Sequence, residues 1–298
     1  MTTAAARDPR FGLFLVPNAA DYPDLLRQAA ACERGDLDLI GIQDHPYQRR
    51  YLDTFALIGD LLARTERLCI FPDVANLPLR PPATLAKLAA SLDAMSGGRF
   101  ELGLGAGAFW DGVAAMGGPR RAPGESVDAL EEANEIIRRF WSGERSISHE
   151  GRHYQVSGLH PGPPPAHEIG VWIGAYKPRM LDLAGRLADG WVPSYGGAPP
   201  EAVPEMSKRI EEGAARAGRD PIAIRRLYNV KGAIVDGPVR ERLNGPPDHW
   251  IETLTGFVLE LGFDSFIFWP EDDVVGQVER FAQEVAPGVR EAVAAARR

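Results

Sequence analysis

The chain has 298 residues, of which 45% are hydrophobic and 25% are charged, a composition typical of a globular protein. Its formal net charge is −8 and its Lys and Arg residues form no cluster, which argues against nucleic acid or an anionic membrane as a partner. The start of the chain lacks the apolar segment of a secretory signal, and no apolar run is long enough to span a membrane, so we expect a cytoplasmic protein.

In the first third of the chain, short apolar runs alternate with longer amphipathic runs. The apolar runs predict strands at residues 11–16, 37–42, 67–76 and 99–105. The amphipathic runs predict helices at residues 21–34, 54–65 and 81–96. The third of these helices is expected to face the core with Leu85, Leu88, Leu92 and Met95.

The same alternation continues in the rest of the chain. A helix is predicted at residues 125–141, followed by a β-hairpin around Glu150-Gly151 and a proline-rich loop at 160–168. Further strands are predicted at residues 171–175 and 190–195, within 224–235, and at 264–270. Helices are predicted at residues 177–190, 200–217 and 248–262, and at the C-terminal end.

Eight predicted strands, each followed by a helix, indicate a parallel α/β sheet with crossover helices. In a chain of this length, eight such units indicate a closed (β/α)8 TIM barrel, with insertions after strand 4 and before strand 5. We expect one domain over residues 11–298, preceded by a flexible tail at residues 1–10. Cys32 and Cys69 fall in different predicted elements and are expected to be buried thiols rather than a disulfide.

The sequence RFELGLGAG at residues 99–107 ends a predicted strand with a glycine at every second position. Gly103, Gly105 and Ala108 match the dinucleotide fingerprint G-x-G-x-x-A, which would indicate a nicotinamide-binding Rossmann fold. That fingerprint belongs in the first βα turn of its domain, whereas three units precede it here, so a barrel is favoured. Alternate glycines at the end of a barrel strand let a flat ligand approach the backbone, or they relieve crowding inside the barrel.

Several segments resemble the bacterial luciferase-like superfamily of flavin- or deazaflavin-dependent barrel oxidoreductases. The matching segments, in chain order, are IGIQDH, PPATLAKLAASLDAMSGGRFELGLGAG, GESVDALEEANEIIRRFW, VWIGA, MLDLAGRLADGW and GFDSFIFW. The resemblance extends from about residue 11 to residue 285. It implies a homodimer with coenzyme F420 or FMN at the C-terminal ends of the strands. F420 would serve hydride transfer to or from a small organic substrate, and FMN would serve monooxygenation.

Asp44 and His45 follow the second predicted strand. Taken alone, Asp44 could cap the next turn while His45 packs at the rim. Relatives that use F420 resemble this chain in carrying an Asp-His pair here, whereas FMN-using relatives often carry Glu-His-His, so the pair favours F420. The resemblance implies that His45 passes a proton or orients the substrate, and that Asp44 fixes its tautomer or binds backbone amides.

The resemblance also implies a set of cofactor-binding residues. Asp73 and Val74 are expected to form a non-proline cis peptide behind the cofactor ring, with Asn76 near the ring edge; otherwise the segment is a bulged strand. The ring would be lined by Gly105, Ala106 and Gly107. Ala106 replaces the catalytic glutamate of the F420-dependent sugar-phosphate dehydrogenases, which argues against that substrate. The cofactor phosphate would be bound by Gly174, Ala175, Tyr176 and Arg179.

Four aromatic residues at predicted strand ends are candidates for the wall of an apolar substrate pocket, although each could also simply pack: Phe109, Trp110, Tyr195 and Trp269. The histidines near the hairpin lack the spacing of metal ligands, so no metal is expected. Two other functions stay open, a nicotinamide-dependent Rossmann reductase and a non-catalytic flavin-binding barrel of the same superfamily. The sequence does not specify the substrate.

Overall fold

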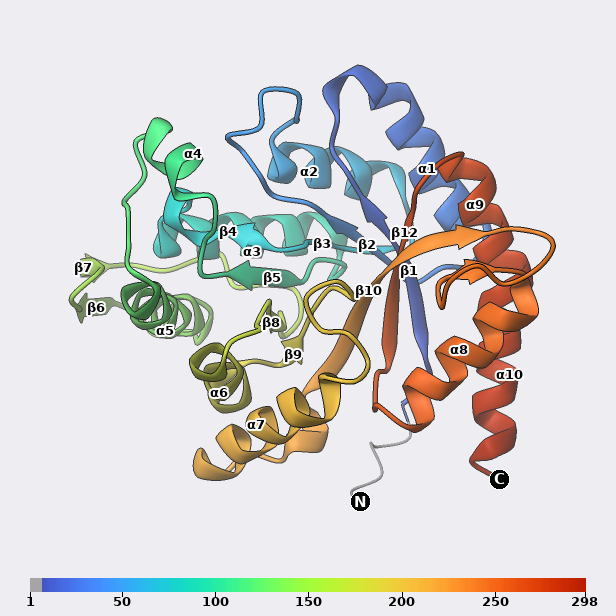
Figure 1. Cartoon of the computed structure of the whole chain (residues 1–298). Coiled ribbons are helices and arrows are strands. Elements are labelled where there is room, and N and C mark those ends of the chain that lie inside the picture. Colours follow the sequence, from blue (N-terminus) through green and yellow to red (C-terminus); the bar gives the residue numbers. More distant parts are fainter. Residues whose placement is uncertain (1–6) are drawn as a thin grey trace.

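The computed structural model describes residues 7–298, which form a parallel α/β barrel (Figure 1). The sheet follows the order β3-β2-β1-β12-β10-β9-β8-β5-β4. β3 and β4 are two parts of one strand position, which residues 73–74 interrupt. β4 pairs with β5, and Ile70 of β3 forms a bridge with Phe100, just before β5. Within the described residues the barrel therefore has eight strand positions, and the predicted TIM-barrel fold is confirmed.

The barrel strands pair in parallel with their neighbours. They are β1 (Arg10–Leu15), β2 (Leu39–Ile42), β3 (Cys69–Pro72), β4 (Ala75–Asn76), β5 (Leu102–Gly105), β8 (Val171–Ile173), β9 (Gly190–Trp191), β10 (Arg225–Ile234) and β12 (Ser265–Pro270). A short β11 (Asn244–Gly245) pairs with the end of β10. Each of these barrel strands overlaps a segment predicted from its apolar run, and β1 begins one residue earlier than predicted.

Helices surround the barrel on its outside (Figure 1). They are α1 (Tyr22–Arg34), α2 (Thr54–Arg64), α3 (Pro82–Ser96), α5 (Pro123–Trp141), α6 (Pro178–Leu187), α7 (Val203–Arg216), α8 (Pro247–Leu259), α9 (Val274–Arg280) and α10 (Ala286–Ala296). Among the helices of residues 7–298, none combines the length and the apolar character needed to cross a membrane.

The prediction that Met95 of α3 faces the core was wrong. Met95 is 81% exposed, although the apolar spacing placed it on the inner face. Leu85, Ala89 and Leu92 carry the buried face instead, at the i, i+4 and i+7 positions of a helix. Met95 lies about a quarter of a turn away from that stripe, and the buried face extends in the other direction, over Ala86 and Ala90.

Both predicted insertions are present. The segment after β5 contains the short helix α4 (Trp110–Ala115). Before β8, the antiparallel strands β6 (Ile147–Glu150) and β7 (Gln155–Leu159) form the hairpin predicted around Glu150-Gly151.

The expected tail at residues 1–10 lies partly inside the structure. Residues 1–6 are outside the described residues, whereas Arg10 begins β1. Arg7 donates hydrogen bonds to the carboxylate of Asp264 at 3.3 Å and to the carbonyl oxygen of Ala223 at 2.9 Å. The packed part of the chain therefore begins before residue 11.

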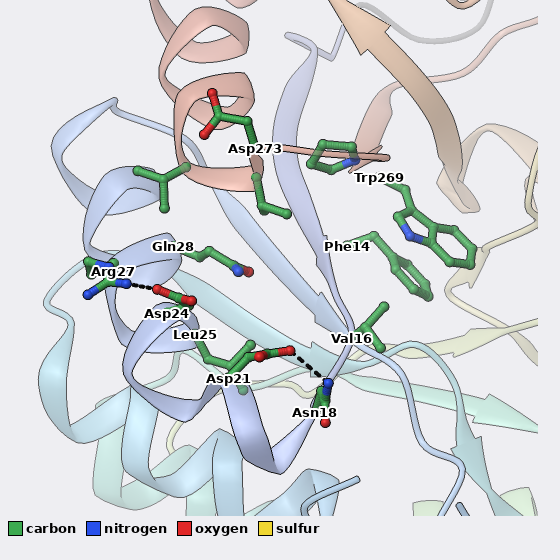
Figure 2. Close-up of a pocket in the computed structure, with 13 residues that line it drawn as sticks. Phe14, Val16, Asn18, Asp21, Asp24, Leu25, Arg27, Gln28, Trp269 and Asp273 are labelled. Carbon is green, nitrogen blue, oxygen red and sulfur yellow. Dashed lines mark hydrogen bonds and ion pairs between the residues drawn. The ribbon is translucent and has the colours of Figure 1, made fainter. Parts of the chain in front are cut away.

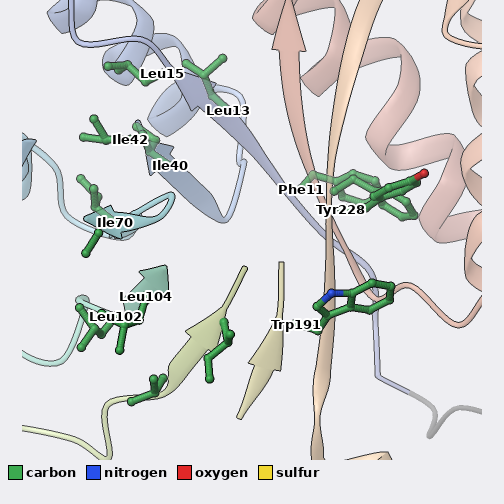
Figure 3. Close-up of a cluster of buried hydrophobic side chains, with 14 of the residues drawn as sticks. Phe11, Leu13, Leu15, Ile40, Ile42, Ile70, Leu102, Leu104, Trp191 and Tyr228 are labelled. Carbon is green, nitrogen blue, oxygen red and sulfur yellow. The ribbon is translucent and has the colours of Figure 1, made fainter. Parts of the chain in front are cut away.

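Side chains of each strand alternate between the barrel interior and the layer beneath the helices. The interior contains Phe14, Leu39, Phe71, Trp172, Val192, Leu227 and Ile267. Figure 3 shows residues of the outer layer, among them Leu13, Leu15, Ile40, Ile42, Ile70, Leu102 and Leu104. Burial on both faces explains why the strands appear in the sequence as continuous apolar runs. Cys32 and Cys69 are both free thiols, as expected, but only Cys32 is fully buried and Cys69 is partly exposed.

The alternate glycines of β5 make room for the neighbouring strand. A Cβ atom on Gly103 would overlap the carbonyl oxygen of Pro72, and one on Gly105 would lie 2.7 Å from the side chain of Val74. Gly107 has a φ of +103°, a conformation that side chains rarely adopt. The close approach of the Pro72 carbonyl inside the barrel therefore explains why residue 103 is a glycine. The Rossmann alternative is wrong, because these glycines end the fourth strand position of a closed barrel.

Gly103→Ala is expected to lower the free energy of unfolding by about 2 kcal/mol or more, because the clashing partner is a backbone atom that cannot rotate away. Gly256→Ala in α8 is the matched control, since its Cβ would meet no atom of residues 7–298 within 4 Å. Alanine favours a helix interior over glycine by about 1 kcal/mol, so this control should not lose stability. Urea unfolding of both variants checks the prediction, and similar losses in the two would contradict it.

Candidate functional site

The C-terminal ends of the strands bring the predicted cofactor and catalytic residues to one rim of the barrel. Asp44 and His45 follow β2, Asn76 ends β4, Gly105 ends β5, and Gly174 follows β8. Because the barrel strands are parallel, all these ends lie on the same side. In TIM barrels this is the side on which functional sites are built.

Val74 forms an apolar surface on this rim. The peptide bond between Asp73 and Val74 is cis, as the resemblance implied. Val74 is partly exposed, and a Cβ atom on Gly105 or Gly174 would lie 2.7 Å or 3.3 Å from its Cγ2 atom. The two glycines therefore leave the flanks of Val74 free of side chains, which suits the approach of a flat apolar group.

Asp44 links the ends of three elements. Its carboxylate accepts hydrogen bonds from Arg80 at 2.7 Å and 2.8 Å and from the backbone amide of Asn76 at 2.8 Å. Arg80 also pairs at 2.9 Å with Asp53, the N-cap residue of α2. A bidentate carboxylate–guanidinium pair fixes both position and orientation. Oδ1 of Asp44 accepts from Arg80, and Oδ2 accepts from both Arg80 and Asn76. Asp44 therefore links these residues and makes no direct hydrogen bond that would set the tautomer of His45.

His45 is half-buried and pairs with Tyr47. Its Nδ1 atom lies 2.5 Å from the Tyr47 hydroxyl, and the ring of Phe109 lies edge-on at 5.5 Å between centroids. Burial lowers the pKa of His45 below its ordinary value, against the opposing effect of the Asp44 carboxylate. Burial and Asp44 raise the pKa of Tyr47 to about 12. Both side chains are therefore uncharged at neutral pH, with Nε2 as the remaining polar atom of the imidazole.

Three buried oxygen atoms near the rim lack hydrogen-bond partners among residues 7–298: Asp73 Oδ2, Asn76 Oδ1 and Asn229 Oδ1. The Asp73 carboxyl points into the barrel, where a Cβ atom on Gly41 would lie 2.8 Å from Oδ2. Burial raises the pKa of Asp73 to about 7, although hydrogen bonding with Asn229 opposes this shift. Buried acceptors without partners are costly, so their presence indicates a place where a bound donor or water completes the structure.

The turn between β8 and α6 offers fewer of the expected anion-binding groups than the sequence suggested. The amide of Gly174 donates to the carbonyl oxygen of Leu104 at 3.2 Å and is used inside the barrel. Arg179 donates to Asp128 on α5 at 2.8 Å. The backbone at Ala175 and Tyr176 and the first turn of α6 remain as the part of this turn suited to a phosphate.

The four aromatic candidates for a substrate pocket do not gather at one cavity. Phe109 lies beside His45, Trp110 begins α4, and Tyr195 lies 6.0 Å from the ring of Tyr228. Trp269 alone among the four lines a cavity of about 600 Å³, which opens between α1 and α9 at the ends of β1 and β12 (Figure 2). The structure thus divides these residues among several parts of the rim.

Three residues of the rim were missed by the sequence analysis. Tyr47 stands two residues after His45, and its polar ring beside a candidate catalytic residue was an available signal. Asn229 occupies an inward-facing position of β10, two residues after Leu227, so the period-two pattern of the strand could have marked it as a buried polar residue. Arg80 gave no local signal, because its partner Asp44 is distant in the sequence.

The closed barrel carries an uncharged histidine and unpartnered acceptors at its C-terminal rim, the side on which barrel enzymes build their small-molecule sites. The chain belongs to the luciferase-like monooxygenase family, whose model matches residues 8–238. No group of three or more His, Cys, Asp or Glu side chains in residues 7–298 is arranged to hold a metal ion.

Similar sequences include proteins with and without an assigned activity. An uncharacterised protein of Mycobacterium tuberculosis is 32% identical over 238 residues, which cover 79% of this chain and 77% of that protein. An F420-dependent glucose-6-phosphate dehydrogenase of Microbacterium testaceum is 30% identical over 228 residues, which cover 74% of this chain and 67% of the enzyme.

Solved structures share the fold at lower sequence identity. An F420-dependent secondary alcohol dehydrogenase, in complex with an F420-acetone adduct, superposes with a TM-score of 0.84 at 20% identity, covering 95% of this chain and 99% of that one. A monooxygenase from Streptomyces bottropensis superposes with a TM-score of 0.80 at 20% identity, covering 93% and 99%.

Arg80→Gln is expected to lower the free energy of unfolding by about 3 kcal/mol, because it leaves the buried Asp44 carboxylate without its ionic partner. Arg64→Gln, which removes the exposed pair with Asp60, is the matched control and should have a much smaller effect. Urea unfolding at pH 7 measures both. An Arg80→Gln variant as stable as Arg64→Gln would show that the pair does not anchor the rim.

Asp73→Asn is expected to change how stability depends on pH. Between about pH 4 and pH 7 the folded chain keeps a proton on Asp73 that the unfolded chain releases, so this group's contribution to stability decreases as the pH rises. Between pH 5 and pH 8 the loss amounts to about 3 kcal/mol, and the variant should lack it. Urea unfolding of the ligand-free protein at both pH values tests this, and identical pH dependence in the two proteins would refute it.

Proposed function

We propose that this chain is an oxidoreductase that uses coenzyme F420 to transfer a hydride to or from a small organic substrate. The proposal is carried by the Asp44-His45 pair at the barrel mouth, in which Asp44 is locked to Arg80 while His45 stays uncharged and half-buried. Two findings support F420: a dehydrogenase at 30% identity depends on it, and a protein of the same fold is bound to an F420-acetone adduct.

The residues of the rim fit a ring cofactor of the deazaflavin or flavin type. Val74 offers an apolar surface with glycine on both flanks, and Asn76 Oδ1 is a buried acceptor without a partner among residues 7–298, suited to an N–H group at a ring edge. The backbone at Ala175 and Tyr176, together with the first turn of α6, would hold the phosphate. When bound, F420 supplies a ring carbon that donates or accepts the hydride.

His45 is the proton-handling group in this proposal. The Tyr47 hydroxyl can either accept a hydrogen bond from Nδ1–H or donate one to a bare Nδ1. In the first case Nε2 is a base that takes the proton of a substrate hydroxyl. In the second, Nε2–H hydrogen-bonds a carbonyl oxygen and gives it a proton as Nδ1 takes the proton of the Tyr47 hydroxyl. The lowered pKa of His45 keeps both neutral tautomers available at pH 7.

FMN is the alternative cofactor, and the family description together with a monooxygenase of the same fold supports it. With FMN the expected activity is monooxygenation. A third candidate is a non-catalytic flavin-binding barrel, which would bind the ring without turnover.

We further propose that the chain forms a single domain, which includes Arg7 and Arg10 as well as residues 11–298. We propose that it is a cytoplasmic homodimer that acts on a small molecule and binds neither nucleic acid nor membrane. The net charge of −8 and the free thiols of Cys32 and Cys69 support this assignment. The dimer is supported by the family resemblance.

Equilibrium titration of the ligand-free protein with oxidised and reduced F420 and FMN tests the cofactor assignment. F420 is expected to bind at least tenfold more tightly than FMN, and the opposite preference would replace the proposal with the FMN alternative.

His45→Ala should retain F420 binding and lose about 100-fold or more in F420-linked turnover of an alcohol or ketone substrate. Unchanged turnover in that variant would remove the proton-transfer role.

A further inference from the structure

Strands β1 and β12 separate at the mouth of the barrel. Their last paired residues are Leu13 and Phe268. Beyond that point, β1 pairs with β2 as far as Leu15, and β12 pairs with β10 as far as Pro270. The barrel wall therefore opens between these two strands, on the side where α1 and α9 pack against each other (Figure 1).

A cavity of about 600 Å³ occupies this opening (Figure 2). Its apolar wall on the barrel side consists of Phe14, Val16 and Trp269, and the rings of Phe14 and Trp269 stack with centroids 4.2 Å apart. On the helix side it is lined by residues of α1 together with Val274 and Val275 of α9. The volume lies within the range of small-molecule sites, and the lining extends from the ends of β1 and β12 to α1 and α9.

Gln28 is the polar group that marks this cavity as a binding site. Its side chain, on α1, is only 9% exposed and points into the cavity (Figure 2). Its amide has no hydrogen-bond partner within residues 7–298, although a buried primary amide offers two donors and one acceptor. The amide faces the cavity, so a ligand with a hydroxyl or amino group could take the place of water on it.

The charged residues of the cavity favour cations over anions. Asp21, Asp24 and Asp273 contribute three carboxylates and Arg27 one guanidinium, which gives a formal net charge of −2. Arg27 is already paired with Asp24. The Asp21 carboxylate accepts a hydrogen bond from Asn18 at 2.7 Å, and such a neutral donor leaves its negative charge in place. A phosphate or carboxylate group would meet uncompensated negative charge here.

We propose that this cavity binds the part of the substrate remote from the reacting atom, and that it selects a neutral or cationic organic molecule, an alcohol or amine with an apolar body. Phe14 and Trp269 would contact the apolar body, Gln28 would bind the hydroxyl or amino group, and Asp21 and Asp273 would attract a positive charge. The inference rests on the proposed oxidoreductase function and assigns the substrate class of its site. It separates this chain from relatives named for glucose-6-phosphate, whose phosphate is an anion.

Matched six-carbon probes test the proposal. Binding of hexylamine, hexan-1-ol and hexanoate to the full chain is measured by isothermal titration at low salt. Hexylamine is expected to bind at least tenfold more tightly than hexanoate, and the Asp21→Asn, Asp273→Asn double variant should reduce that ratio at least fivefold. Glu212→Gln, an exposed position on α7, is the control and should leave the ratio unchanged.

Filling the cavity gives a second test. Gln28→Trp should abolish the binding of hexylamine and hexan-1-ol, and Val275→Phe from the opposite wall replaces it if the first variant fails to fold. Equal affinity for hexylamine and hexanoate, or probe binding that is unchanged in a folded variant with a filled cavity, would overturn the proposal.

F420 titration of the same samples separates the substrate-class inference from the proposed function. F420 binding without probe binding defeats the substrate-class inference alone, and probe binding without F420 binding defeats the proposed function.

Discussion

The site depends on the space that glycines leave for residues 72–74, which connect β3 to β4. Gly103 lets the carbonyl of Pro72 approach within the barrel, and Gly105 and Gly174 leave room for the Val74 side chain at the mouth. A larger residue at Gly103 would collide with the backbone of Pro72, and one at Gly105 or Gly174 would press on the side chain of Val74. The same sterics that close the barrel therefore expose an apolar surface at the point where the strand ends converge.

Charge is tightly controlled around that surface. The buried carboxylate of Asp44 is paired with Arg80, so its charge is neutralised where it would be most costly. His45 and Asp73 have pKa values shifted by burial toward their uncharged forms. The negative charge of the mouth instead lies farther out, around Asp21 and Asp273. An uncharged region beside an acidic outer cavity suits the proton-handling role proposed for His45 and the attraction of cationic substrates.

The barrel could be predicted from the sequence because each strand is a short apolar run between amphipathic helices, and the same pattern located both insertions. Met95 shows a limit of that method, because side-chain spacing does not reveal that alanines carry the buried face of α3. The rim positions of Asp44, His45 and Val74 were also predictable. The pairing of Asp44 with Arg80 was not, because it joins residues 36 positions apart that meet only when the barrel closes. The opening between β1 and β12 depends on where strand pairing ends, which composition does not encode.

Hydrogen–deuterium exchange with and without saturating F420 tests most directly the claim that the rim around Val74 holds the cofactor. The account predicts that F420 slows exchange in three separate segments, residues 73–77, 105–108 and 175–180, and leaves the outer helices α7 and α8 unchanged. F420 bound under the same conditions with no slowing in these segments, or with slowing confined to other parts of the chain, would contradict it.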